Sequence, residues 1–268
     1  MDIQRISACT YPMREKPFDY ALRVLADAGV YRADLWGREP HFPELPTDEQ
    51  LTAIEEASAA TGVAIANLGT YPGGDFASDD EATRDADLEK MRITIEAARR
   101  LGCRSIRVRP GHGEDPAIIE QIAPLMARSA AWAEDAGIYL GMENHRGSIA
   151  GNPDDALRLC EAVGSRHFGV LYEPCNLWHG GVDYREAFDT FSDWIVHVHI
   201  KDGRRTDDGF ERVHLGEGEI DARWVVDALE GIGYDGDYAL EYEIPEIEPV
   251  ETGLRKWVTI FQKITAKT

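Results

Sequence analysis

The sequence predicts a single (β/α)8 barrel, the TIM-barrel fold, over residues 1–268. Three observations support this prediction. Strand-like and helix-like segments alternate without a break, which is typical of a parallel sheet covered by helices. The length of 268 residues is close to the roughly 250 residues that such a barrel usually takes. No linker rich in Pro, Gly or Ser and no change of composition divides the chain, so we expect one domain.

The expected strands are short apolar runs. In the first half of the chain they cover residues 3–9, 33–36, 63–68 and 105–108. In the second half they are the runs IYLGMENH, FGVLYEP, IVHVHIKD and YALEYE. The segments between neighbouring runs are long enough to hold a helix, so consecutive strands are expected to be parallel.

Helices are expected between these strands because the gaps carry start and stop signals. The expected starts, in chain order, are residue 18, Thr47, Ser78, Asp115, Asn152, Asp183 and Asp221. These Ser, Thr, Asp and Asn side chains can accept hydrogen bonds from the free N–H groups of a first helical turn. Thr47 and Ser78 are each followed three residues later by Gln or Glu, a capping-box pattern. Gly29 and Gly102 mark two helix ends, and an amphipathic segment over residues 250–264 completes the eighth pair.

Composition excludes some classes of protein. Acidic residues outnumber basic ones by 49 to 28, giving a net charge of -21, which argues against a nucleic-acid partner because such binding neutralises phosphates with Lys and Arg. No apolar stretch of about 18 residues and no signal-peptide pattern occurs, so we expect a cytoplasmic protein that does not bind membranes. The four cysteines show no regular spacing and are expected to be free thiols.

Four runs in the second half of the chain end in a residue that can bind a metal ion. These residues are Glu143, Glu173, His199 and Glu241. Parallel strands present their C-terminal ends on one side of a barrel, so the four side chains are expected to converge. A single glutamate at a strand end is usually a solvated loop residue, but four consecutive strands with such an end favour a site. Three carboxylates and one imidazole favour Mn²⁺, with Mg²⁺, Co²⁺ and Zn²⁺ as alternatives.

Two of these strands carry a second candidate ligand on the same face. His197 and His199 are two residues apart; His199 is nearer the mouth and is the preferred ligand, and His197 is interpreted as a hydrogen-bonded core histidine. Glu241 and Glu243 pose the same choice. The step from His199 to Lys201 serves as a depth marker. It places Glu241 level with His199 and Glu243 one layer nearer the mouth. Glu241 is therefore the preferred metal ligand, and Glu243 is the competing candidate.

Further residues near the strand ends are expected to contact a substrate. They are Trp36, Arg109, His145, Asn176 and Lys201. Arg109 can anchor a carboxylate, a phosphate or a sugar hydroxyl, with a surface ion pair as an equal alternative. His145 can orient or protonate a substrate oxygen, Lys201 can stabilise a developing oxyanion, and Trp36 can form the wall of a pocket for a sugar ring.

Several motifs in the second half of the chain carry a family resemblance. They are ENH at 143–145, YEPCNL at 172–177, HVHIKD at 197–202, LGEGEID at 215–221 and ALEYE at 239–243. Together they resemble the xylose isomerase-like superfamily of sugar phosphate isomerases and epimerases. The resemblance implies that Glu143, Glu173, His199 and Glu241 occupy the four metal-ligand positions, and that Glu143 and Glu241 also act as acid and base. The superfamily usually has Asp at the position of Glu173, and its members often form homo-oligomers.

The resemblance and the chemistry of the four residues predict a metal-dependent isomerase or epimerase. Its substrate is expected to be a keto-sugar or a polyol-derived compound. Proton transfer next to a carbonyl would pass through an enediolate stabilised by the metal ion. The first alternative is a dehydratase of an inosose or a dehydroshikimate-type substrate. An endonuclease IV-like repair enzyme, which needs additional histidines, and a sugar-binding barrel without catalysis are further alternatives.

Overall fold

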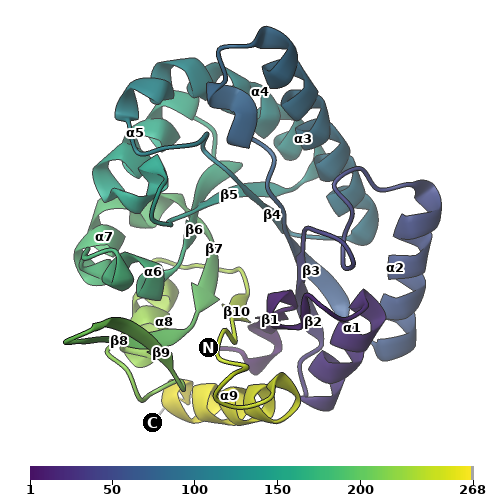
Figure 1. Cartoon of the computed structure of the whole chain (residues 1–268), viewed down its shortest axis with the longest axis vertical. Coiled ribbons are helices and arrows are strands. Elements are labelled where there is room, and N and C mark those ends of the chain that lie inside the picture. Colours follow the sequence, from purple (N-terminus) through teal and green to yellow (C-terminus); the bar gives the residue numbers. More distant parts are fainter. Residues whose placement is uncertain (267–268) are drawn as a thin grey trace.

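Eight parallel strands close into a barrel in the computed structural model, which describes residues 1–266 (Figure 1). The strands are β1 (Ile6–Cys9), β2 (Arg32–Trp36), β3 (Ala64–Gly69), β4 (Ser105–Val108), β5 (Tyr139–Glu143), β6 (Phe168–Tyr172), β7 (Ile195–Ile200) and β10 (Tyr238–Leu240). Each strand pairs with its sequence neighbours in the barrel, and β10 pairs with β1 to close the ring. The predicted (β/α)8 barrel is therefore confirmed.

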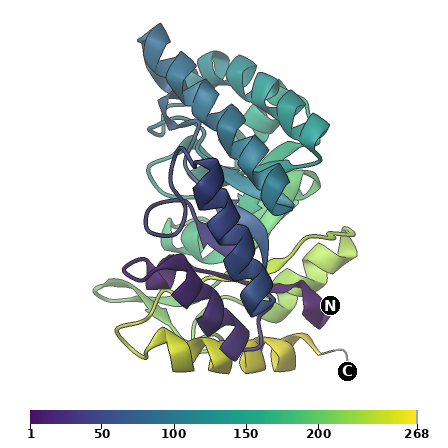
Figure 2. The ribbon, with the colours of Figure 1, turned by 90° about the vertical axis from the view of Figure 1, so that its right-hand side faces the viewer.

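Helices surround the barrel. They are α1 (Phe18–Asp27), α2 (Asp48–Thr61), α3 (Glu81–Leu101), α4 (Ile119–Ala136), α5 (Pro153–Val163), α6 (Pro174–His179), α7 (Tyr184–Phe191), α8 (Ala222–Gly231) and α9 (Val250–Thr265). Consecutive helices from α1 to α5 contact one another, and α9 contacts both α8 and α1 (Figure 2). The outer layer is thereby closed where the two ends of the chain meet.

Most of the predicted helix starts are confirmed, and one is wrong. Thr47 forms the full capping box with Gln50. Ser78 does not begin a helix, because it closes a short 3-10 turn at Gly74–Ala77 and has extended backbone angles. The helix begins three residues later, with the carboxylate of Asp80 accepting a hydrogen bond from the N–H of Thr83. The first strand is also shorter than expected, since Ile3–Arg5 forms a 3-10 turn.

Two elements were not predicted from the sequence. The short helix α6 follows β6 directly, and a hairpin of β8 (Asp202–Thr206) and β9 (Gly209–Val213) lies between β7 and α8. The hairpin projects beside α6 at the edge of the barrel (Figure 1). Its base is fixed by the carboxylate of Asp202, which accepts hydrogen bonds of 2.8 to 3.1 Å from the N–H groups of Gly203, Gly216, Gly218 and Ile220.

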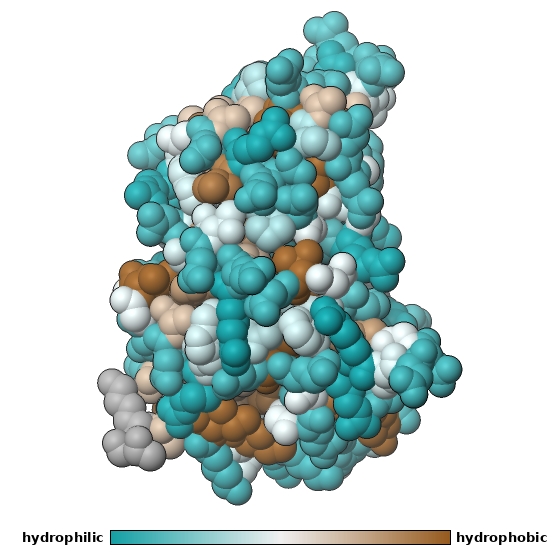
Figure 3. Space-filling view, turned by 90° about the vertical axis from the view of Figure 1, so that its left-hand side faces the viewer, coloured by the Kyte–Doolittle hydropathy of each residue, from teal (hydrophilic) through white to brown (hydrophobic). Residues whose placement is uncertain are grey.

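The surface is polar and the core apolar. The face in Figure 3 carries mainly hydrophilic residues, with apolar side chains in small separate groups. Among the described residues, no helix combines the length and the apolar character needed to span a membrane. All four cysteines are buried free thiols, as expected.

Candidate active site

A cavity of about 200 Å³ opens at the C-terminal mouth of the barrel. All five residues that were expected to contact a substrate line it: Trp36, Arg109, His145, Asn176 and Lys201. Three of the four expected metal ligands, Glu143, His199 and Glu241, line it as well. A volume of this size is below the range typical of drug-sized ligands and fits a small molecule.

Glu143, His199 and Glu241 form a compact group. Each offers one ligand atom, and these atoms all lie within 4.8 Å of one another. His199 Nδ1 lies 3.5 Å from Glu143 Oε1 and 3.6 Å from Glu241 Oε2. The same Nδ1 atom is buried and has no hydrogen-bond partner. A buried nitrogen without a partner, facing two carboxylates, is an arrangement that a divalent cation would satisfy.

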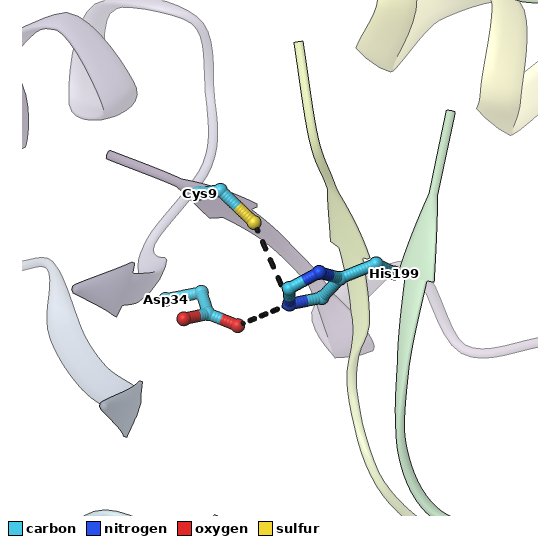
Figure 4. A group of neighbouring side chains, drawn as sticks. All are labelled: Cys9, Asp34 and His199. Atoms are coloured by element: carbon cyan, nitrogen blue, oxygen red, sulfur yellow. Dashed lines mark hydrogen bonds and ion pairs between the residues drawn. The ribbon is translucent and has the colours of Figure 1, made fainter. Parts of the chain in front are cut away.

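Asp34 holds the opposite edge of the His199 ring (Figure 4). Its Oδ2 atom lies 2.9 Å from Nε2 of His199 and 2.9 Å from Nε2 of His197. His197 is thus a buried, hydrogen-bonded core histidine, as the sequence suggested. Burial lowers the pKa of His199, but the groups around it, Glu241 and Asp34 among them, raise that pKa well above its usual value, so the ring is protonated. A cation at Nδ1 would replace the proton there, while the Nε2 proton stays donated to Asp34.

Cys9 also lies beside this edge of the ring. Its Sγ atom is 3.7 Å from His199 Nε2, and Cys9, Asp34 and His199 form a second group of atoms within metal-binding distance of one another (Figure 4). Burial raises the pKa of the Cys9 thiol well above its usual value, so the sulfur stays protonated at neutral pH. The hydrogen bond to Asp34 already occupies Nε2, so the Nδ1 side is the better cation site.

Glu143 is ionised at neutral pH. Burial raises the pKa of its carboxyl group, but the charges of Arg107 and His199 outweigh burial and bring the pKa to about 2. Arg107 Nη2 lies 2.7 Å from Glu143 Oε2, and Asn176 Nδ2 lies 3.5 Å from Glu143 Oε1. One oxygen of Glu143 is therefore held by Arg107, and the other faces His199.

Lys201 occupies the centre of an acidic cluster. Its Nζ atom lies 2.6 Å from Glu241 Oε2, 2.9 Å from Glu243 Oε2 and 3.4 Å from Glu173 Oε2. Burial raises the pKa of Glu241, but Lys201 and His199 hold it well below its usual value. Glu243 also pairs with Arg212 at 2.9 Å. Glu241 and Glu243 are thus both bound to Lys201, and only Glu241 also approaches His199.

The expected depth of Glu241 is wrong. The register pairs Ala239 with His199 and Leu240 with Ile200, so Ala239 and not Glu241 is level with His199. Strand β10 ends at Leu240, and the N–H of Glu241 donates to the carbonyl of Ile200. The Glu241 side chain therefore starts one layer nearer the mouth than expected and reaches back towards His199.

Glu173 lies apart from the compact group. It is fully buried, and its carboxylate accepts hydrogen bonds from the N–H groups of Cys175 at 3.0 Å and Asn176 at 2.6 Å, which caps α6. Burial raises its pKa to about 7, although Lys201 opposes the shift. The side chain, one methylene longer than that of Asp, folds back onto the helix end. Within residues 1–266, its one ion pair joins it to Lys201 at 3.4 Å.

Sequence reasoning missed several residues of this site, Cys9 among them. Asp34 lies within strand β2, where an acidic residue inside an apolar run was a signal that could have been used. Tyr71 lies just beyond β3, and its hydroxyl accepts a hydrogen bond of 2.9 Å from Trp36 Nε1. Arg212 comes from the unpredicted hairpin, so no strand-end pattern could have indicated it.

Asp34→Ala tests the role of the buried carboxylate. We expect a loss of about 3 kcal/mol in the free energy of unfolding, because two buried histidines lose their shared partner. We also expect a loss of metal affinity of about 10- to 100-fold, as is usual for outer partners of ligating histidines. Urea denaturation and metal titration measure the two effects.

Asp237→Ala is the matched control, since it removes a buried carboxylate bound to Arg32 on the same barrel and should leave metal affinity unchanged. Equal metal affinity in both variants would contradict this role.

The fold is thus a closed (β/α)8 barrel. Its C-terminal mouth holds a candidate metal site, a buried cluster of glutamates and one histidine. The chain belongs to the xylose isomerase-like TIM barrel family, whose profile matches residues 22–262. The resemblance seen in the sequence motifs is therefore confirmed.

The chain is similar to proteins of known sequence and to solved structures. L-ribulose 3-epimerase from Mesorhizobium japonicum is 26% identical over 232 residues, which cover 82% of this chain and 75% of that protein. An uncharacterised protein from Methanocaldococcus jannaschii is 28% identical over 176 residues, covering 62% of this chain and 59% of that protein. A xylose isomerase-like TIM barrel protein from Mycobacterium smegmatis, solved in complex with magnesium, superimposes with a TM-score of 0.80 at 17% identity, covering 97% of each chain.

Proposed function

We propose that this protein is a metal-dependent isomerase or epimerase that acts on a small keto-sugar or polyol-derived compound. The observation that carries the proposal is the buried Nδ1 of His199, which has no hydrogen-bond partner and faces Glu143 and Glu241 at 3.5 and 3.6 Å. The relationship to an L-ribulose 3-epimerase supports the same class of reaction. The four buried free thiols suit the reducing cytoplasm that we expect for the protein.

Glu143, His199 and Glu241 would hold the metal ion. The oxygen-rich donor set favours Mn²⁺, with Mg²⁺, Co²⁺ and Zn²⁺ as alternatives. Glu173 would complete the four-residue set only if its carboxylate left the N–H groups of Cys175 and Asn176. A divalent ion bound here would polarise a substrate carbonyl and so make the neighbouring C–H group more acidic.

The two glutamates are placed to move a proton. Glu143 and Glu241 reach the cavity from different strands and are both ionised at neutral pH, so either carboxylate can accept a proton from carbon. Return of a proton to the opposite face of the same carbon gives epimerisation, and the other glutamate, which is ionised at rest, must first take up that proton from solvent. Return to the neighbouring carbon exchanges the positions of carbonyl and hydroxyl. Lys201 keeps a positive charge beside Glu241 and can stabilise negative charge on a substrate oxygen.

Elimination is the second candidate reaction, and the position of Lys201 favours it. A protonated amine in the cavity is a group that can give a proton to a departing hydroxyl. The same first step, removal of a proton next to the carbonyl, would then end in loss of water.

Hydrogen exchange tests the proposed reaction. The protein loaded with Mn²⁺ is incubated in D₂O with a panel of ketoses, inososes and keto-acids, and deuterium next to the carbonyl is measured by mass spectrometry. We expect uptake with at least one substrate, and water loss only if elimination is the reaction. Glu143→Gln, which keeps the shape of the side chain, should abolish the uptake. Lack of deuterium uptake across the panel, in protein with stoichiometric metal, would contradict the proposal.

A further inference from the structure

Three arginine side chains surround one tyrosine ring at the mouth of the barrel. The guanidinium carbons of Arg38, Arg107 and Arg109 lie 4.5, 4.8 and 5.0 Å from the centre of the Tyr71 ring. Arg109 and Tyr71 line the cavity that contains Glu143, and Arg38 and Tyr71 line the groove next to it. Cation–π contact with the ring positions the guanidinium groups but does not neutralise their charge.

Only one of the three arginines has an anionic partner. Arg107 is paired with Glu143 at 2.7 Å. Within residues 1–266, Arg38 and Arg109 form no ion pair with any carboxylate. Glu44, which lines the groove beside Arg38, is instead paired with Lys90 at 2.8 Å.

Two neighbouring arginines thus carry a charge that no carboxylate of the described residues balances. With 49 acidic and 28 basic residues, carboxylates are abundant, yet two arginines at the cavity rim remain without one. Burial and the positive charges of Arg107 and Arg38 lower the pKa of Arg109, which shows that like charges are held close together. A bound anion would relieve this repulsion, and a guanidinium fork matches the oxygens of a phosphate or a carboxylate.

We propose that Arg38 and Arg109, held on Tyr71, bind an anionic group at one end of the substrate. The substrate class is then a phosphorylated keto-sugar or a sugar-derived keto-acid, and not a neutral ketose. This inference rests on the proposed function in one respect, that the cavity at Glu143 and Glu241 is where the substrate reacts. The anionic group lies over Tyr71, and the reacting carbon lies towards the two glutamates.

Anion binding is tested first, without any turnover. Inorganic phosphate and acetate are titrated into the protein by calorimetry, with Arg38→Gln, Arg109→Gln and the double variant compared with the wild type. We expect each single change to weaken binding of the preferred anion by about 10- to 100-fold, the range for a charged hydrogen bond. Preference for phosphate indicates a phosphorylated substrate, and preference for acetate a keto-acid. Arg38 is exposed, so its variant should fold.

Arg128→Gln is the matched control. Arg128 lies 5.0 Å from the ring centre of Trp132 on α4, outside the cavity, so it removes the same kind of cation–π contact. Its anion binding should equal that of the wild type. Absence of binding at millimolar phosphate and acetate, or equal binding by the wild type and the double variant, would overturn the proposal.

Substrate preference is tested second, by the deuterium exchange described above. A ketopentose is compared with its 5-phosphate and with a keto-acid of similar size. We expect the wild type to have a higher kcat/KM for an anionic compound, and the double variant to lose that advantage. Equal kcat/KM for the neutral and anionic compounds in the wild type would overturn the anion site. Anion binding that depends on Arg38 and Arg109, without exchange on any compound, would leave the anion site standing and contradict the proposed reaction.

Discussion

Replacing Glu241 by glutamine is expected to lower turnover by about two to four orders of magnitude, the usual contribution of a general acid or base. Glutamine keeps the size of the side chain and can still accept a hydrogen bond from Lys201, which lies 2.6 Å from Glu241 Oε2. It cannot take up a proton from carbon. Thermal unfolding should therefore change little, and the rate of deuterium exchange should fall with kcat.

Glu243→Gln is the control for this prediction. Glu243 contacts the same ammonium group at 2.9 Å and pairs with Arg212, but it does not belong to the compact group around His199. Its replacement should reduce turnover by less than tenfold, which is about 1.4 kcal/mol of activation free energy. A larger loss in Glu243→Gln than in Glu241→Gln would reverse the roles of the two glutamates.

Metal binding is expected to depend on Glu143 and His199. Loss of an outer partner typically costs 10- to 100-fold in metal affinity, so Glu143→Ala and His199→Ala, which remove direct ligands, should each cost more than about 100-fold. Elemental analysis of the purified variants and Mn²⁺ titration measure the loss. Turnover should disappear together with the metal.

Glu173 provides the informative comparison. Glu173→Gln removes the charge and keeps one of the two oxygens that now accept from the N–H groups of Cys175 and Asn176, so half of the helix cap remains. Metal content equal to that of the wild type would show that Glu173 serves as a helix cap and a partner of Lys201. Loss of metal in this variant, as large as in Glu143→Ala, would restore Glu173 as a ligand. Full metal content in Glu143→Ala would instead contradict the compact group.

The barrel and the meeting of its strand ends were predictable because they depend on local periodicity. Apolar runs alternate with capped helices, and a strand-end residue such as Glu143 or His199 must then lie at the common mouth. The direction of a side chain beyond that point is decided by tertiary contacts. Glu173 ends its run like the others, yet its carboxylate accepts hydrogen bonds from the free N–H groups at the start of α6. The pairing of Ala239 with His199 could not be predicted either, because neither run by itself specifies which residues of the two strands lie opposite each other.

Residues that reach the cavity from loops could not be found by the same reasoning. Tyr71 follows a strand but has no titratable or ligating pattern around it, and its importance becomes visible only when three arginines are seen around its ring. Arg212 lies twelve residues beyond the end of β7, on a hairpin that only the Asp208-Gly209 turn signal at its tip could have indicated. Asp34 was the exception, since a carboxylate inside a buried strand requires partners, and His197 and His199 are those partners.

The carboxylate of Asp202 gives the hairpin a property of its own. The four hydrogen bonds that it accepts from N–H groups join the first residue of the hairpin to the segment that leads into α8. The base of the hairpin is therefore fixed. Changes in length or sequence at the tip, between Thr206 and Gly209, are thereby isolated from Lys201 and His199. The body of the hairpin is coupled to the cavity, because Arg212 on β9 pairs with Glu243, and Glu243 contacts Lys201. The tip of the hairpin can therefore vary without disturbing the site, whereas Arg212 cannot.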